Sequence, residues 1–146
     1  MTKNRNNLLY VCSLIEYVAR QTGNTPAVVA KKAGPETFAH FLEFADIYHC
    51  QTFEQSSAEF IEYMGGLENG SRTMNVYESV PSPVTVGHVY ANLVEDIHQP
   101  GQSLPETLYR VMTSFVSDEI SNFHSSFYYS GDRYILACYR AGKVLD

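Results

Sequence analysis

Two carboxylate–histidine pairs come closest, among the residues of this sequence, to the spacing of a metal site. Asp46 precedes His49 by three residues and Glu95 precedes His98 by three, so each pair is expected on one face of a helix. Two such pairs, completed by carboxylates from other helices, form the dinuclear metal sites of some four-helix bundles. Both histidines end their predicted helices, where an imidazole stabilises the helix dipole without a metal. We predict no metal and no cofactor, and keep a carboxylate–histidine metal protein as an alternative.

Nucleophilic catalysis has no recognisable motif in this chain. The sequence contains no Gly-x-Ser-x-Gly elbow, no phosphate-binding glycine loop and no dinucleotide fingerprint. Cys50, His124 and Asp118 could be named as a catalytic set, but any chain with three cysteines and five histidines yields such a combination. We therefore expect a protein that is not an enzyme and assign no catalytic residues.

Residues 26–44 fit a further alternative, a helix-turn-helix regulator that binds DNA. The segment reads as a short helix, a turn at Gly34 and a longer helix. The longer helix carries Glu36 and Glu43, which would repel phosphates, and Lys31–Lys32 is the only adjacent basic pair in the chain. The formal net charge of −6 also opposes nucleic-acid binding. We expect a structural helical corner at this position.

An aromatic tract, Phe123–Ser130, is the strongest indication of a protein partner. Protein interfaces are enriched in aromatic residues and arginine, and depleted in Lys, Glu and Asp at their centres. Adjacent Tyr128 and Tyr129 cannot both point inward on one helix, so at least one of them is expected to reach solvent or a partner. The alternative is that Phe123 and Phe127 fill the core between the last two helices. The predicted interaction residues are Phe127, Tyr128, Tyr129, Arg133 and Tyr134.

The composition predicts one folded domain whose surface is partly covered by uncharged polar residues and tyrosine. Charged residues make up 18% of the 146 residues, where an ordinary soluble domain has about 25%. The three cysteines are an odd number in apolar surroundings, which predicts buried thiols in a reducing compartment. No apolar run reaches the roughly 18 residues of a membrane span, and Glu16 interrupts the apolar stretch that could mimic a secretory signal. The predicted location is the cytoplasm, with no membrane contact.

Apolar residues at three- and four-residue intervals predict an all-α fold of about seven helices in an orthogonal or bundle-like arrangement. The expected helices cover residues 6–21, 27–33, 35–49, 52–64, 86–98, 103–116 and 132–141, with residues 118–127 extending or restarting the sixth. The expected N-caps are Thr25 for the second helix, Thr85 for the fifth and Ser103 for the sixth. Residues 65–83, rich in glycine and proline, form an irregular loop that joins two helical groups and contains a candidate extended segment, Met74–Val80. We predict a single domain over 1–146, with 1–64 and 84–146 as its subdivision.

Four segments carry a resemblance to a known family: Asn7–Cys12 with the nearby Glu16, Gly23–Ala30, Phe44–Cys50 and Ala58–Met64. Residues 6–64, which contain them, resemble a small bacterial family of helical domains of unknown function. Its members are often encoded beside toxin-like genes, including ADP-ribosyltransferase-like ones. The resemblance implies an antitoxin or another partner-binding role and transfers no catalytic residues. Cys50 departs from the polar residue that the family pattern has after the histidine.

These observations favour a non-enzymatic bacterial protein that works by binding another protein or regulating it. The expected partner is the product of a neighbouring toxin-like gene, and a homodimer is a second way to cover exposed aromatic residues. Neither a nucleic acid nor a membrane is expected as a partner.

Overall fold

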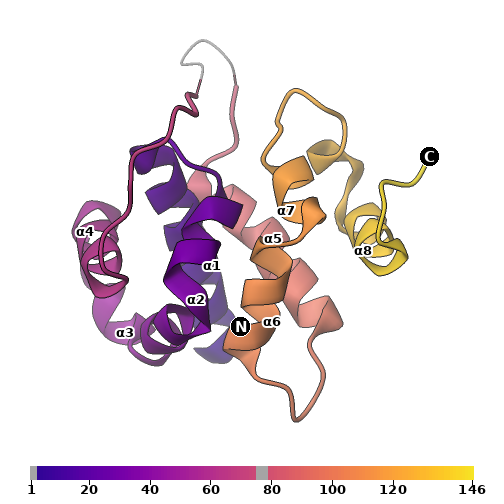
Figure 1. Ribbon diagram of the computed structural model, residues 1–146. Coiled ribbons are helices and arrows are strands. Elements are labelled where there is room, and N and C mark those ends of the chain that lie inside the picture. The colour runs from indigo at the N-terminus through magenta and orange to yellow at the C-terminus, as the bar shows by residue number, and fades with distance from the viewer. Residues whose placement is uncertain (1–2, 75–78) are drawn as a thin grey trace.

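The computed structural model describes residues 3–74 and 79–146, and within these two ranges the chain is helical and forms no strand (Figure 1). Its elements are α1 (Lys3–Thr22), α2 (Pro26–Glu43), α3 (Ala45–Tyr48), α4 (Phe53–Tyr63), α5 (Pro83–Ile97), α6 (Leu104–Met112), α7 (Phe115–Ile120), the one-turn 3-10 helix η1 (Tyr128–Ser130) and α8 (Asp132–Ala141). The all-α prediction is confirmed. Residues 75–78 of the predicted extended segment Met74–Val80 lie outside the described residues.

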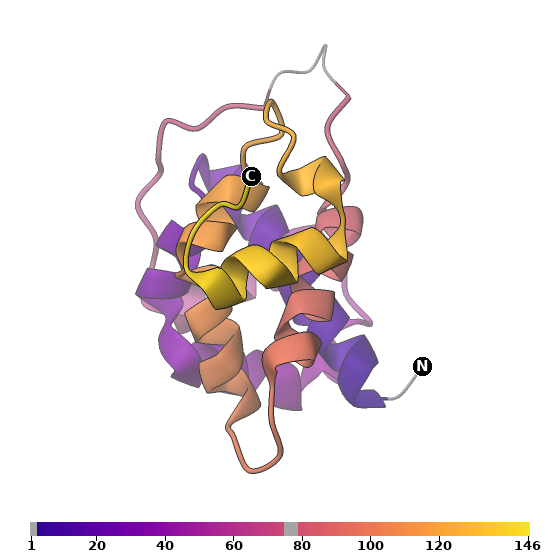
Figure 2. The same cartoon turned by 90° about the vertical axis from the view of Figure 1, so that its right-hand side faces the viewer.

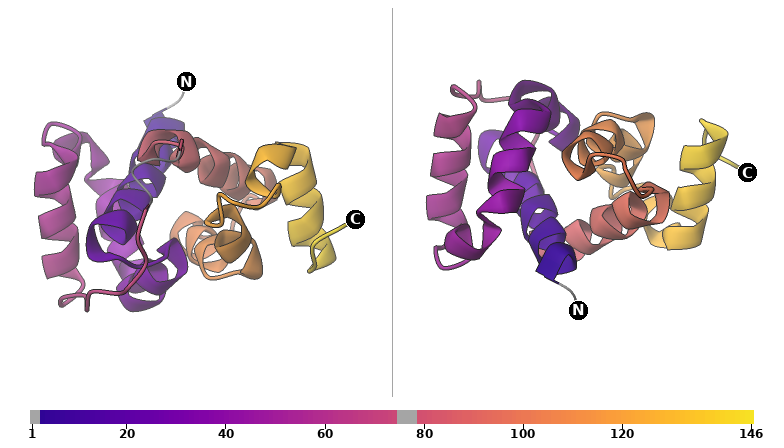
Figure 3. Two further views of the ribbon diagram at one scale, coloured as in Figure 1. Left: turned by 90° about the horizontal axis from the view of Figure 1, so that it is seen from above. Right: turned by 90° about the horizontal axis from the view of Figure 1, so that it is seen from below.

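Helix α1 is the central element of the fold. Its side chains are buried around most of the helix, among them Val11, Cys12, Leu14, Ile15, Val18 and Ala19. A helix that is apolar on nearly all sides needs neighbours on several sides. Helices α2, α4 and α5 supply them, and Figure 3 shows α1 lying between α4 on one side and the α5–α8 half on the other.

The break predicted at Gly34 is present inside α2. Gly34 has φ 74° and ψ 167°, so it interrupts the helical geometry and divides α2 into two helices of different direction. Thr25 caps the first of them by accepting a hydrogen bond from the Val28 amide. The second helix ends at Glu43 and is followed by the separate turn α3, so the prediction of one continuous helix over 35–49 is wrong.

Helix α5 begins three residues before its predicted start. Ser82, not Thr85, is the N-cap, because its hydroxyl accepts a hydrogen bond from the Thr85 amide at 3.2 Å and Pro83 occupies the first helical position. The predicted cap Ser103 is confirmed at the start of α6. Helix α6 ends at Met112 and a separate helix, α7, covers Phe115–Ile120, so the helix restarts rather than continues, and it ends before residue 127.

Both helical groups contribute to one continuous hydrophobic core. Helix α1 makes its most extensive contacts with α5, where Gly87 lies directly against Ser13. Helix α8 covers this half from outside, against α5 and α7 (Figure 2). Residues 3–64 and 84–146 are therefore two parts of one packed unit.

The connection between the two groups is held against the end of α1. The Gly70 amide donates to the Thr22 carbonyl and the Arg72 amide to the Gly23 carbonyl, each at 2.8 Å. This part of the connection is thus fixed to the helical body by backbone hydrogen bonds. None of the helices in residues 3–74 and 79–146 is both long enough and apolar enough to span a membrane.

Candidate functional site

The predicted aromatic tract is divided between the core and the surface. Phe127 and Tyr128 are 3% and 9% exposed, which contradicts their prediction as interaction residues and, for Phe127, agrees with the alternative that this ring fills the core. The chain leaves the helix after α7, and this irregular path turns both rings inward, where Tyr128 packs edge-to-face on Phe123. Tyr129 is 57% exposed, as the argument from adjacent tyrosines requires.

The remaining residues of the tract lie on α8. Arg133 is exposed, whereas Tyr134 is half-buried and donates its hydroxyl hydrogen to the Leu145 carbonyl at 2.6 Å. Tyr129 and Arg133 therefore stay predicted interaction residues, and Tyr134 has a structural hydrogen bond of its own.

The two carboxylate–histidine pairs do not converge. Asp46 and His49 border one hollow of the surface, and Glu95 and His98 border another. His98 instead places Nδ1 3.0 Å from the hydroxyl of Thr107. No group of three or more His, Cys, Asp or Glu side chains that could hold a metal ion is found in the described ranges. This contradicts the dinuclear arrangement that the two pairs would have to form together.

The cysteines differ in exposure. Cys12 and Cys138 are buried free thiols, as predicted, but Cys50 is exposed on the connection between α3 and α4. Asp118 and His124 line a pocket beside α7, and Cys50 is not among its residues. The three members of the nominal catalytic set are therefore not brought together.

The helix-turn-helix candidate is built into the core. Phe38 and Phe41 are fully buried in the second half of α2, while Glu36 and Glu43 are exposed there. The surface that would have to meet DNA phosphates is therefore acidic, which opposes binding.

A buried charge cluster that was not predicted lies beneath the loop connection. Glu16 is fully buried in α1, and Arg20 donates from Nε to Glu16 Oε2 at 2.7 Å. A guanidinium nitrogen of Arg72 lies 3.9 Å from the same oxygen. Burial raises the pKa of the Glu16 carboxyl, and the two guanidiniums, Arg20 first, oppose that shift. The other oxygen, Oε1, has no hydrogen-bond partner among the described residues.

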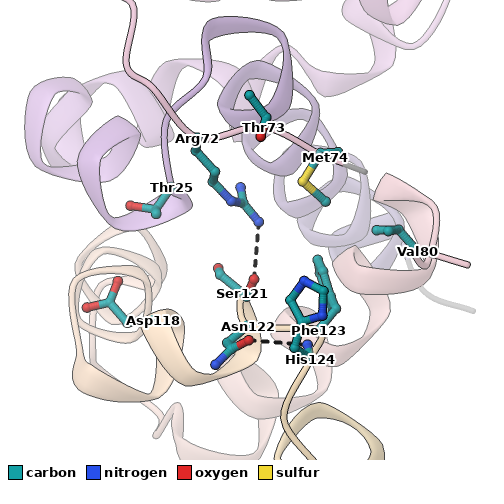
Figure 4. Close-up of a pocket in the computed structure, with 10 residues that line it drawn as sticks. All are labelled: Thr25, Arg72, Thr73, Met74, Val80, Asp118, Ser121, Asn122, Phe123 and His124. Carbon is teal, nitrogen blue, oxygen red and sulfur yellow. Dashed lines mark hydrogen bonds between the residues drawn. The ribbon is translucent and has the colours of Figure 1, made fainter. Parts of the chain in front are cut away.

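The two arginines tie distant parts of the chain to this carboxylate. Arg72 donates to the carbonyl of Asn24 at 3.0 Å. It also donates to the carbonyl of Ser121 at 3.3 Å (Figure 4). Arg20 donates to the Pro81 carbonyl at 2.6 Å. A pocket of about 360 Å³ opens beside Arg72, but both guanidiniums already bind groups of the protein. The cluster therefore holds the loop and the end of α7 onto α1. The sequence feature that indicates this cluster is Glu16 inside an apolar helical stretch, because a glutamate buried there needs a partner for its charge.

An exposed aromatic cluster where α2, α3 and α4 meet was also not predicted. The His40 ring stacks on the Tyr63 ring with 4.1 Å between centroids and lies 5.0 Å from the Phe44 ring. His40 Nε2 is 2.9 Å from the Tyr48 hydroxyl. Phe44, Tyr63 and Ile47 are 38%, 50% and 61% exposed. We call these residues the aromatic patch: His40, Phe44, Ile47, Tyr48 and Tyr63.

The stretch of chain that contains the aromatic patch is acidic, although Lys32, which lies just before this stretch, reaches Gly65 at the end of α4. Residues 33–71, which include the whole patch, contain seven Asp and Glu and no Lys or Arg, whereas the rest of the chain contains nine acidic and ten basic residues. The net negative charge therefore comes entirely from this stretch. All seven carboxylate side chains are exposed: Glu36, Glu43, Asp46, Glu54, Glu59, Glu62 and Glu68. Burial, and after it the charge of Glu59, raise the pKa of Tyr48.

No family model, curated protein or solved structure matches this chain. The resemblance of residues 6–64 to a bacterial helical family stays a prediction, and inferences about function depend on the surface itself.

Proposed function

We propose that this protein is a non-enzymatic module that binds another protein through the aromatic patch. The observation that carries the proposal is the exposure of Phe44 and Tyr63, whose rings both contact the His40 ring, together with the exposure of Ile47 one helical turn after Phe44. Large apolar side chains that gather on a surface are typical of interfaces, and aromatic residues supply most of the binding energy there.

Contacts among the rings order the side chains of the aromatic patch before a partner binds. His40 is held between the Tyr63 and Phe44 rings, and Phe41 beneath it is fully buried against Tyr48, at 4.2 Å between centroids. Side chains that are already ordered lose little conformational entropy when a partner docks. The patch therefore supports recognition by a preformed surface.

The class of partner follows from the predictions made on the sequence. A cytoplasmic product of a neighbouring toxin-like gene fits a small helical binding protein of this kind. The metal and DNA alternatives gain no support, because the carboxylate–histidine pairs lie apart and the second half of α2, residues 35–43, exposes Glu36 and Glu43 and contains no Lys or Arg.

Co-purification with the neighbouring gene product tests the proposal. The full-length protein is expected to bind that product saturably, and an Ile47→Ala, Tyr63→Ala double variant to lose at least about tenfold in affinity. Tyr129→Ala is the matched control, since it removes an equally exposed ring outside the patch. Circular dichroism checks that each variant is folded.

Two results would contradict the proposal. One is equal binding by the wild-type protein and the Ile47→Ala, Tyr63→Ala variant. The other is loss of binding in Tyr129→Ala alone, which would move the interface to the predicted tract near α8. Light scattering over a range of concentrations separates binding of a different protein from self-association.

A further inference from the structure

We infer that the partner presents a basic surface to the aromatic patch, with Lys or Arg side chains that reach its rings and the surrounding carboxylates. This inference rests on the proposed function and names the chemistry of the partner. The charge of the chain around the patch is one-sided, since residues 33–71 contain seven exposed carboxylates and no Lys or Arg.

The carboxylates lie close enough to the patch to act on a docked partner. Glu59 precedes Tyr63 by four residues on α4, so the two side chains lie on one face of the helix, and Glu62 and Glu43 are the chain neighbours of Tyr63 and Phe44. Exposed charges act on one another within the Debye length, which is about 8 Å at physiological salt and shortens as the salt concentration rises. A cationic side chain that arrives at the rings therefore meets several carboxylates at once.

The rings themselves also favour cations. Exposed faces of Tyr and Phe attract guanidinium and ammonium groups, most strongly when water is excluded. Tyr63 and Phe44 are both more than one-third exposed and lie on either side of His40. An arginine can pack its plane on these rings and at the same time pair with a neighbouring carboxylate.

The same charges argue against other occupants. In a symmetric dimer formed through this patch, each acidic stretch would face its own copy, and like charges across an interface weaken association. A nucleic acid would meet the same repulsion. Electrostatic complementarity therefore favours a different protein with a basic face.

Two synthetic peptides are the probes for this inference. One is an amphipathic helix of about 18 residues with leucines on one face and Lys and Arg on its flanks, and the other has Glu in place of every Lys and Arg. Fluorescence anisotropy with the full-length protein is expected to give a Kd at least about tenfold lower for the basic peptide. Between about 50 mM and about 500 mM salt this Kd is expected to rise about tenfold or more.

Matched variants locate the effect. Glu59→Gln, Glu62→Gln is expected to weaken binding of the basic peptide by about threefold to tenfold, since each exposed pair contributes modestly. Asp96→Asn, Glu106→Gln changes the net charge equally at exposed positions outside residues 33–71 and is expected to leave binding unchanged within about twofold. Tyr63→Ala is expected to weaken binding by about tenfold.

Failure of the inference can be told apart from failure of the proposed function. The inference is overturned if the acidic peptide binds as tightly as the basic one, if neither binds, or if the two double variants behave alike. If the neighbouring gene product still depends on Ile47 and Tyr63, the proposed function stands without it. If binding of that product is independent of both residues, the proposed function itself is wrong.

Discussion

Replacement of Gly87 by alanine is expected to destabilise the protein, although alanine is the better helix former. A Cβ atom at Gly87 would lie 2.4 Å from the Ser13 hydroxyl oxygen, 3.0 Å from the Ser13 nitrogen and 3.1 Å from its Cα. Real Cβ atoms do not approach other heavy atoms as closely as 2.4 Å. The hydroxyl oxygen could rotate away, but the backbone of α1 cannot move without shifting the core around it.

The magnitude follows from two opposing terms. Alanine in place of glycine stabilises an exposed helix by about 1 kcal/mol. Forcing an additional methyl group into a packed core costs about 1–3 kcal/mol, or more where backbone must move. Because Ser13 is held through its hydroxyl bond to the Leu9 carbonyl at 2.7 Å and α1 is surrounded by helices, the second term should dominate. We expect a net loss of about 1–2 kcal/mol in the free energy of unfolding.

Urea unfolding followed by circular dichroism measures this loss. A double variant, Ser13→Ala with Gly87→Ala, removes the closest clash and should recover part of the stability. If Gly87→Ala is as stable as the wild-type protein or more stable, then α1 and α5 do not cross at backbone distance, and the packing described for the centre of the fold is wrong.

Two further predictions concern the buried carboxylate. Arg20→Met should lower the free energy of unfolding by about 3–5 kcal/mol, because it removes the closest partner of the buried Glu16 charge. Arg72→Met should cost less, about 2 kcal/mol, because Arg72 is farther from that carboxylate and mainly loses its bonds to the Asn24 and Ser121 carbonyls. Burial raises the pKa of Glu16 above its ordinary value of 4.5, so its contribution to stability is fully present below pH 4.5 and is lost as the pH rises through the folded-state pKa. The stability of the wild-type protein relative to Glu16→Gln should therefore fall with rising pH over that window.

Urea unfolding of the same variants at several pH values checks both predictions. If Arg72→Met is more damaging than Arg20→Met, the Glu16–Arg20 bond is not the main compensation of the buried charge. If the difference between the wild-type protein and Glu16→Gln is constant with pH, or increases with it, burial does not dominate the titration of Glu16.

Local features were readable from the sequence because they depend on neighbouring residues. The helical spacing of apolar residues, the caps Thr25 and Ser103 and the break at Gly34 all arise within a few residues of one another. The start of α5 was misplaced because Ser82 and Thr85 are both capable caps, and Pro83 fits the first helical position after the former.

The candidate site was only partly visible in the sequence. The absence of Lys and Arg from residues 33–71 can be counted directly, and it predicts an acidic surface. That His40, Phe44 and Tyr63 meet on that surface depends on how α4 packs against the end of α2. The residue types alone do not show which aromatic ring of such a segment is buried by neighbouring helices.

The sequence by itself determined the helical class, most helix boundaries and the sign of the charge. The tertiary structure decided that Phe127 and Tyr128 are buried while Phe44 and Tyr63 are exposed, and that Arg72 reaches Glu16 from a distant loop. The physical reason is the separation along the chain between the residues that interact. Helix formation is governed by backbone hydrogen bonds and side chains within a few residues, whereas burial and charge pairing depend on elements that are far apart in the chain.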